Sequence, residues 1–277
     1  MDTVKVLIRV GPAATLTALC WAPSEAEAQF HWLFDPTPRE EMRELSTDRP
    51  DTTESAYSVD PGHTQIETEI LSGELGYDGR WRGETLMETN AKLGLTPFAD
   101  LQVVFTTFEE GVDVDGNHEG GMGDTAMRLK INLFGNDGGD VAIALLPFVT
   151  LPTGHGSVTA GQAQYGLAIP VAVGLPEGFG LSFQLEGDLV SDVSGPYHGE
   201  LLTTVSVGHE LVGPLAAFVE LTNNVVFDSV VEAQGTVNGG LTLGFDDAIQ
   251  LDAGLNLRTW GNAPSDVRLF LGATVRQ

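Results

Sequence analysis

Apolar and polar residues alternate along nearly the whole chain after residue 61, and this limits the possible folds more than any other feature. In MGDTAMRLKINLF, for example, Met127, Leu129 and Ile131 share one face, whereas Arg128 and Lys130 share the other. A period of two residues predicts β-strands with one apolar and one polar face. Twelve such segments can be placed, at residues 62–71, 82–95, 100–109, 122–134, 140–151, 164–175, 180–190, 198–211, 215–225, 233–245, 248–259 and 267–277. The chain is therefore predicted to be all-β.

The connections between these segments alternate in length. Short ones read PFAD, NDGGD, PEGF, VGP and DDA, and longer ones such as EGVDVDGNHEGG and LPTGHGSVTAGQA lie between them. A membrane barrel has tight turns at its periplasmic end and longer loops outside. Since no linker divides the strands, residues 62–277 are predicted to form a single closed antiparallel transmembrane β-barrel of about 12 strands.

A soluble antiparallel sandwich or barrel would also show alternation. Two features favour the membrane barrel instead. The polar faces contain many small residues, such as Gly235, Gly239, Gly240 and Gly244, and the apolar faces continue from the first strand to the twelfth. In lipid, closure is also the way in which a sheet satisfies its edge hydrogen bonds. The predicted location is the bacterial outer membrane, with its lipid as a partner.

The N-terminal segment resembles a secretory signal peptide, predicted to span residues 1–28 and to be cleaved. Lys5 and Arg9 precede the short apolar core GPAATLTALCWA, and small residues stand at Ala26 and Ala28. A buried N-terminal helix is the alternative, and a lipid anchor at Cys20 is disfavoured by the bulky residue before it.

Charge and cysteine content narrow the function classes. Removal of residues 1–28 would leave a chain without cysteine, and hence without disulfides. The net charge of −26 makes nucleic acid an unsuitable partner, because phosphates require a basic surface. No apolar run of about 18 residues follows residue 28, which excludes a transmembrane helix there.

If the apolar faces meet lipid, the polar faces line the lumen. The predicted lining residues are Glu67, Glu69, Glu84, Glu88, Lys92, Asp124, Arg128, Lys130, Glu186, Asp188, Glu200, Glu220, Asp252, Arg258, Arg268 and Arg276. Both signs of charge occur, so these residues either hold a narrow barrel together as ion pairs or form a polar conduit, and the two roles are compatible. The acidic excess favours cations or neutral solutes over anions.

Residues 29–61 form a polar, proline-broken segment on the periplasmic side of the first strand. Its stretch STDRPDTTES, residues 46–55, is predicted to be an ordered plug or collar, with Asp48, Arg49, Pro50 and Asp51 as its motif. Pro50 restricts the backbone and lowers the entropy lost on ordering. Arg49 is expected to pair with an inward carboxylate such as Glu67 or Glu88. The alternative is a mobile polar tail.

The chain also resembles a known family. STDRPDTTES at residues 46–55, GHTQIE at 62–67 and LPTG at 151–154 are similar to the outer-membrane proteins labelled "putative MetA-pathway of phenol degradation". The resemblance implies a transporter-like barrel for small solutes, hydrophobic or aromatic ones included. It also implies passage through the barrel-assembly machinery, although the final residues, 275–277, depart from the aromatic end typical of such barrels.

The sequence gives only weak indications of a catalytic or metal-binding site. His155 and Ser157 in TGHGSVT resemble the nucleophile pair of outer-membrane phospholipase A, but the following strand offers no Asn or Asp to orient the histidine. Residues 113–119 space oxygen ligands as calcium loops do, but His118 stands where glycine is expected. A solvated acidic loop is the alternative there. No enzymatic activity, cofactor or metal site is predicted, and lipid hydrolysis or a structural barrel with a blocked lumen remain the alternative functions.

Overall fold

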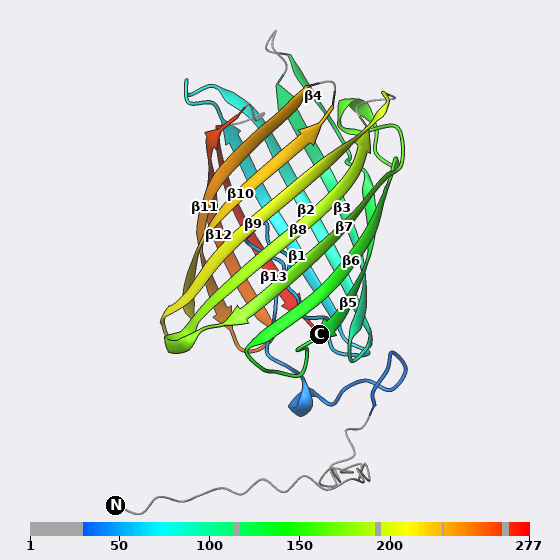
Figure 1. Cartoon of the computed structure of the whole chain (residues 1–277), viewed down its shortest axis with the longest axis vertical. Helices are drawn as coiled ribbons and strands as arrows, with labels where there is room; N and C mark the ends of the chain where they lie inside the picture. Colours follow the sequence, from blue (N-terminus) through cyan, green and yellow to red (C-terminus); the bar gives the residue numbers. More distant parts are fainter. Residues whose placement is uncertain (1–29, 113–116, 192–194, 229, 262–265) are drawn as a thin grey trace, which may run out of the picture. The chain divides into compact units, whose positions relative to one another are not determined.

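Twelve antiparallel strands close into a barrel, and a thirteenth short strand extends one hairpin above the wall (Figure 1). The structure, a computed structural model, describes residues 30–277 except 113–116, 192–194, 229 and 262–265. The predicted signal peptide thus lies outside the described residues. The strands are β1 (Thr64–Leu75), β2 (Trp81–Thr96), β3 (Ala99–Val112), β4 (His118–Gly121), β5 (Thr125–Phe134), β6 (Val141–Leu151), β7 (Gln164–Gly174), β8 (Phe179–Ser191), β9 (Tyr197–Val212), β10 (Leu215–Phe227), β11 (Val231–Phe245), β12 (Ile249–Trp260) and β13 (Val267–Arg276).

Strands adjacent in the sequence are mostly adjacent in the wall, and the barrel closes where β1 pairs with β13. That seam runs from the pair Gln65 and Arg276 to the pair Leu75 and Val267. Short turns lie at the end where β1 begins and β13 ends, so we call this the periplasmic end and the opposite one the outer end. The predicted closed twelve-stranded barrel is confirmed.

Helical structure is limited to three short 3₁₀ turns in the part of the chain that the structure describes: η1 (Arg39–Glu41), η2 (Gly156–Val158) and η3 (Pro176–Gly178). None of the described helices is long and apolar enough to cross a membrane.

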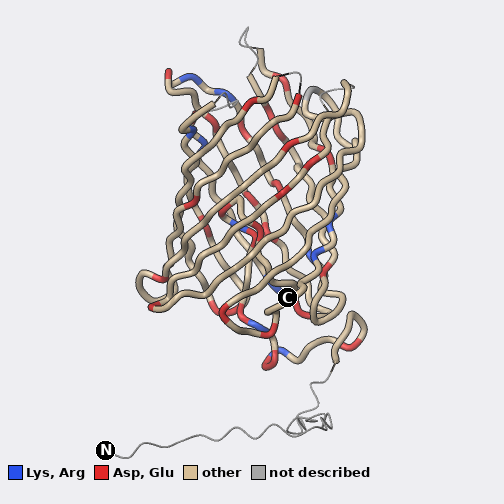
Figure 2. The backbone as a smooth tube through the Cα atoms, viewed as in Figure 1, with Lys and Arg blue, Asp and Glu red and all other residues tan. Residues whose placement is uncertain are grey.

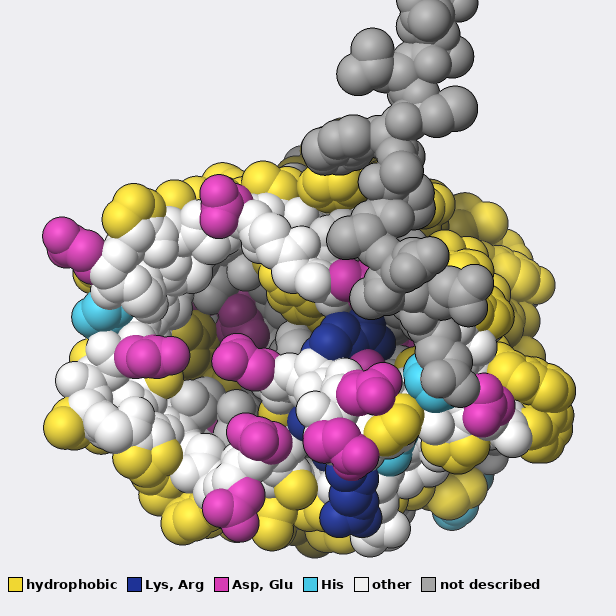
Figure 3. All heavy atoms as spheres, turned by 90° about the horizontal axis from the view of Figure 1, so that it is seen from below, with side chains coloured by type: hydrophobic (Ala, Val, Ile, Leu, Met, Phe, Trp, Pro, Cys, Tyr) yellow, Lys and Arg dark blue, Asp and Glu magenta, His cyan; other side chains and the backbone are white. Residues whose placement is uncertain are grey.

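The outward face carries the apolar residues of each strand. Leu133, Val219 and Leu269 leave 58%, 59% and 49% of their surfaces exposed. Such exposure over the whole wall is compatible with lipid contact and not with water. Figure 3, seen from the periplasmic end, shows hydrophobic side chains around the outside and charged ones gathered around a hollowed mouth.

Strand β4 is the one described strand that alternation did not predict. It pairs only with the end of β3, from His118 opposite Val112 to Gly121 opposite Glu109. Its four residues, HEGG, are too few and too rich in glycine to show a period of two, and the sequence predicts a long loop there.

A bulge near the outer end of β1 and β2 corrects one predicted lining residue. Glu69 and Glu88 face inward as a pair, but the pairing of β1 with β13 shifts by one residue between Glu69 and Leu71, and on β2 Met87 has a positive φ of 56°. The next pair, Leu71 with Leu86, faces outward, and Glu84 then pairs with Gly73 on that same outward face. One extra residue reverses the face of every position beyond it. Glu84 therefore does not line the lumen.

Candidate functional site

The interior of the barrel is occupied by the chain's own residues Ser46–Asp60, which we call the luminal segment (Figure 1). It enters from the periplasmic end and forms neither helix nor strand. Its contacts reach strands on opposite sides of the wall, including Glu67 of β1, Gln184 of β8 and Glu220 of β10. The predicted motif Asp48 to Asp51 thus lies inside the barrel.

Asp48 lies at the centre of a buried charge cluster. Its carboxylate contacts the ammonium groups of Lys92 on β2 and of Lys130 on β5, the latter at 2.5 Å. Lys92 also pairs with Glu67, and the backbone N–H of Ser55 donates to Asp48 Oδ1 at 2.9 Å. Burial alone would raise the pKa of Asp48, but Lys130 and Lys92 outweigh burial and hold this pKa below its usual range. Asp48 therefore fixes the segment as a charged group.

Arg49 occupies a slot formed by three neighbouring strands. Glu69 of β1, Gly272 of β13 and Asp252 of β12 stand in one row across the wall. The guanidinium lies over Gly272, where a Cβ atom would come within 2.4 Å of Nη2. Its Nη2 is 2.8 Å from Asp252 Oδ1, and its Nη1 is 3.3 Å from Glu69 Oε2. The glycine leaves room for the guanidinium between the two carboxylates.

The side-chain partners of Arg49 differ from the predicted ones. Glu69 and Asp252 pair with its guanidinium, whereas Glu67 accepts hydrogen bonds from the backbone N–H groups of Asp48, at 3.0 Å, and of Arg49, at 3.2 Å. Asp252 lies 203 positions away in the sequence. Closure of the barrel brings β1 beside β13, and so brings Asp252 on β12 within reach of a segment that precedes β1; this proximity leaves no local signal in the sequence.

Side chains of the wall accept hydrogen bonds from the segment's backbone. Glu220, fully buried, accepts from the N–H groups of Thr52 at 2.9 Å and of Thr53 at 2.8 Å. Gln184 accepts from Glu54 N at 2.7 Å. Nearer the periplasmic end, the side chain of Asp100 accepts from Val59 N, and the side chain of Asn136 accepts from Ser58 N. Buried backbone donors need such partners, and here the wall supplies them in place of a neighbouring strand.

Three of these acceptors were missed in the sequence: Asp100, Asn136 and Gln184. Asp100 and Gln184 stand at inward positions of their strands, and Asn136 lies in the turn after β5. Alternation could therefore have indicated Gln184 and Asp100, but not Asn136.

Two cavities meet at the tip of the segment, residues Arg49 to Asp51, since these three residues line both. The outer cavity, about 210 Å³, is also lined by Glu88, Asn256 and Arg268. The inner cavity, about 310 Å³, has a wall of small residues that includes Gly180 and Gly208. A path along the lumen would therefore pass this tip.

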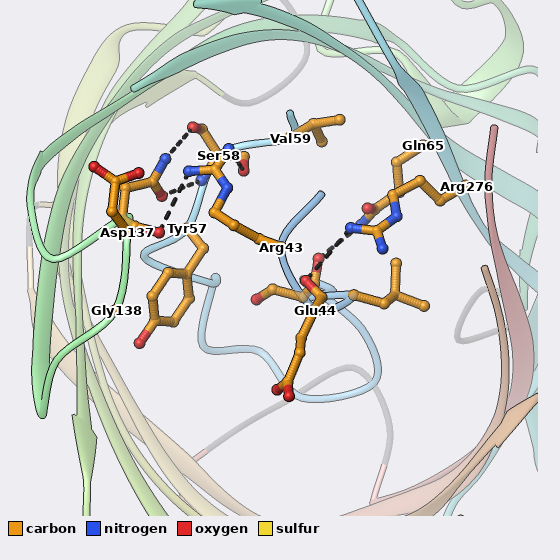
Figure 4. A pocket seen from close by; sticks show the side chains of 12 residues that line it. Arg43, Glu44, Tyr57, Ser58, Val59, Gln65, Asp137, Gly138 and Arg276 are labelled. Atoms are coloured by element: carbon orange, nitrogen blue, oxygen red, sulfur yellow. Dashed lines mark hydrogen bonds between the residues drawn. The ribbon is translucent and has the colours of Figure 1, made fainter. Parts of the chain in front are cut away.

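A third pocket, about 430 Å³, opens at the periplasmic mouth (Figure 4). Arg43, Tyr57 and Arg276 surround it. Arg43 precedes the first strand of the barrel, whereas Arg276 ends the last one. Arg43 Nε pairs with Asp60 at 2.8 Å, and Arg276 lies 3.6 Å from the same carboxylate. Asp60 thus holds the base of the luminal segment to the rim.

Two acids of the segment have raised pKa values. Burial, with Glu220 nearby, raises the pKa of Asp51 to about 7. Burial and then Asp48 raise the pKa of Glu54 to about 7, although Arg128, 2.5 Å away, opposes the shift. Both groups therefore titrate near neutral pH.

The remaining predicted lining residues fall into two groups, one in the lumen and one at the outer rim. In the lumen, Arg268 contacts Glu69, and Gln184 donates to Glu186 at 2.6 Å. Asp188 and Glu200 share the polar face of β8 and β9 as a direct pair. Figure 2 shows acidic residues spread over the height of the barrel and fewer basic ones in small groups.

Two predicted lining residues instead serve the outer rim. Asp124 accepts hydrogen bonds from Gly154 N at 2.9 Å and from Thr159 Oγ1 at 2.8 Å, and so holds the loop after β6. Arg258 pairs with Asp266 in the loop before β13. Their charges organise outer loops, because the strands end at that height.

The weaker chemical signals gain no support. His155 is exposed and precedes η2, and the side chain of Ser157 lies outside what the structure describes, as do residues 113–116 of the acidic loop. Among the described residues, no group of His, Cys, Asp or Glu side chains is arranged to hold a metal ion.

Comparisons with known proteins agree with this architecture. A family model described as "Putative MetA-pathway of phenol degradation" matches residues 47–266, in accord with the resemblance seen in the sequence. The crystal structure of the COG4313 outer membrane channel from Pseudomonas putida F1 superposes with a TM-score of 0.54 at 11% identity, covering 78% of this chain and 94% of that one. The NanC porin gives 0.50 at 8% identity, with 77% and 99% covered. No curated protein sequence matches. The fold is that of outer-membrane barrels.

Proposed function

Since this chain belongs to the family described as "Putative MetA-pathway of phenol degradation", we propose that it is an outer-membrane channel for small solutes, gated by its luminal segment. The observation that carries this proposal is the position of the tip, Arg49 to Asp51, between two cavities of one lumen. The COG4313 channel and the NanC porin, which share the fold, support the channel role.

The solute is proposed to be neutral or cationic, and hydrophobic or aromatic compounds are included because of the family description. The charge of the chain, −26, and the acids along the lumen disfavour anions. On the side of the inner cavity away from the segment, glycine and apolar residues such as Ala217 and Phe218 offer a weakly polar surface, although Glu210 also lines this cavity. No enzymatic step is part of the proposal.

Planar-bilayer recording and liposome flux test the channel role. Deletion of residues 29–55 should raise conductance, and Arg49→Ala should raise it in part, because it removes only the guanidinium's pairs with Glu69 and Asp252 and leaves the other contacts of the segment in place. The channel proposal fails if the deletion variant, folded and inserted, passes neither ions nor small solutes. In that case the chain is a structural barrel with a blocked lumen. Phospholipid hydrolysis that is lost in Ser157→Ala would instead favour the lipid hydrolase.

A separate result would disprove the gating role of the luminal segment. If the deletion and Arg49→Ala both conduct as the parent does, and protease removes the segment freely from folded barrels, the segment does not gate the channel. Heat-modifiable gel mobility of each variant is the control for folding of the barrel.

A further inference from the structure

A tight turn at the base of the barrel presents two aromatic side chains. Trp32 and Asp35 exchange backbone hydrogen bonds of 3.1 and 2.8 Å, with Leu33 and Phe34 between them. We call residues 32–35 the aromatic turn. The rings of Trp32 and Phe34 meet edge to face, with centroids 5.0 Å apart. This geometry gives both rings a fixed orientation relative to each other.

The aromatic turn is fastened to the rim of the barrel. Leu33 N donates to Leu95 O at 2.9 Å, near the end of β2, and Thr37 N donates to Pro61 O at 3.1 Å. Pro36 packs so closely on Gly62 that a Cβ atom there would lie 2.7 Å from the proline ring. Figure 1 shows this stretch, in blue, projecting past the rim beneath the β2–β3 turn. The turn is therefore held at the level where the barrel wall ends.

Both side chains nevertheless leave a large part of their surface uncovered by protein. Trp32 is 47% exposed and Phe34 76% exposed, and the neighbouring Phe30 is also exposed. Beside them at the same end of the barrel stand other exposed apolar side chains: Phe98 in the β2–β3 turn, and Leu133 and Phe134 at the end of β5. The aromatic turn thus continues the lipid-facing band of the wall.

The distribution of aromatic residue types supports the same conclusion. At the outer end, exposed Trp and Tyr side chains form the interfacial belt expected of a membrane barrel: Tyr77, Trp81, Tyr165, Tyr197 and Trp260. At the periplasmic end, the exposed aromatic residues of the described strands and turns are phenylalanines: Phe98, Phe134, Phe179 and Phe245. Trp32 therefore supplies the amphipathic ring that this end of the described wall lacks.

We propose that the aromatic turn is a membrane anchor, seated in the interfacial region of the periplasmic leaflet, with Trp32 and Phe34 among phospholipid headgroups and upper acyl chains. The anchor holds the start of the luminal segment at the rim. Two acidic residues lie in or close to the turn, Asp35 and Glu41, and their carboxylates lie 3.5 and 3.8 Å from the ring nitrogens of His31. Binding therefore rests on the rings and not on attraction to anionic lipid.

Tryptophan fluorescence tests the anchor directly. The substitutions Trp21→Phe, Trp81→Phe and Trp260→Phe leave Trp32 as the only tryptophan, and a sister variant retains only Trp260 from the outer belt. Each full-length barrel is reconstituted in phosphatidylcholine vesicles that carry bromine either near the headgroup or near the chain end. Emission of Trp32 should be blue-shifted and should lose as much intensity to the shallow bromines as that of Trp260 does. Added phosphatidylglycerol should leave the quenching unchanged.

Two results would overturn the proposal. Water-like emission that iodide quenches and bromine does not would place Trp32 in the aqueous phase. Emission that neither quencher changes would mean that protein, from a second copy or a partner, covers the ring.

Limited proteolysis provides a second measurement. The double variant Trp32→Ser, Phe34→Ser should be cleaved faster between residues 36 and 45 in proteoliposomes, with unchanged heat-modifiable mobility of the barrel. The matched control is Phe98→Ser, which removes an exposed rim aromatic that belongs to the wall itself. Equal cleavage of the double variant and the control would also contradict the anchor.

Discussion

Replacement of Asp48 by alanine is expected to release the luminal segment from the lumen. The carboxylate contacts two ammonium groups whose residues are almost fully buried, Lys130 and Lys92, at 0% and 3% exposure. Removal of one partner from a buried ion pair costs roughly 3–5 kcal/mol, because the other charge is left without compensation. Lys92 retains Glu67, so the lower end of that range, about 3 kcal/mol, applies here.

This cost converts into a measurable change in population. Since about 1.4 kcal/mol corresponds to a factor of ten, the ratio of docked to released segment should fall about 100-fold. Limited proteolysis of residues 46–60 in folded barrels follows the released population when opening and closing are fast relative to cleavage. The cleavage rate of Asp48→Ala should therefore rise by about that factor.

Two variants serve as controls for this experiment. Asp48→Asn keeps an acceptor for Ser55 N but loses the charge, and should cleave at an intermediate rate. Asp137→Ala removes an exposed acid at the periplasmic mouth and should cleave as the parent does. If Asp48→Ala resists protease as well as Asp137→Ala does, while both barrels remain heat-modifiable, the buried cluster does not hold the segment and the reasoning is refuted.

Three further perturbations address other parts of the same site. Glu220→Gln retains one acceptor oxygen for the two N–H groups of Thr52 and Thr53, and should weaken docking by about 1–3 kcal/mol, measured as a higher open probability in single-channel recording. Gly272→Val should expel the Arg49 guanidinium from its slot and reproduce the conductance of Arg49→Ala. Conductance should rise as pH increases from about 4 to 7. The docked segment binds the proton of Asp51 more tightly than the released one, with pKa about 7 against 3.8, so docking is strongest at low pH and weakens up to about pH 7. Asp51→Asn should abolish the contribution of this group.

The strands could be predicted because each wall position faces either lipid or lumen, so the fold imposes a strict period of two on the sequence. β6, Val141–Leu151, and β13, Val267–Arg276, lie within one residue of their predicted bounds. The period fails where the chain inserts a residue. The bulge between Glu69 and Leu71 turns Glu84, on the paired strand β2, to the outside, and the sequence of β2 by itself gives no sign of this insertion.

The segment was harder to predict than the wall. Its polarity and Pro50 indicated an ordered element at the mouth, but its partners depend on how far it penetrates and on which strands meet at the seam. Glu69 and Asp252 flank Gly272 only because β1 returns to β13. Contacts of this kind arise from closure, so the sequence indicated which charges line the lumen but not which of them meet Arg49.

The charges of the segment lead to a prediction about ion selectivity. Within the lumen, residues 46–55 contribute three acids, Asp48, Asp51 and Glu54, and one base, Arg49. Two of these acids compensate cations of the wall: Asp48 contacts Lys92 and Lys130, and Glu54 contacts Arg128. The deletion variant should therefore expose uncompensated cations and shift the reversal potential in a salt gradient toward anions.

Arg49→Ala should shift the reversal potential in the opposite direction. This variant leaves Glu69 and Asp252 without the guanidinium between them, although Arg268 still contacts Glu69. A surplus of negative charge at the narrowest part of the path favours cations. Both variants should conduct more than the parent, because both loosen the tip, yet their selectivities should diverge. A common direction of shift would mean that ions do not pass the tip, and that the path lies along the glycine-lined side of the inner cavity instead.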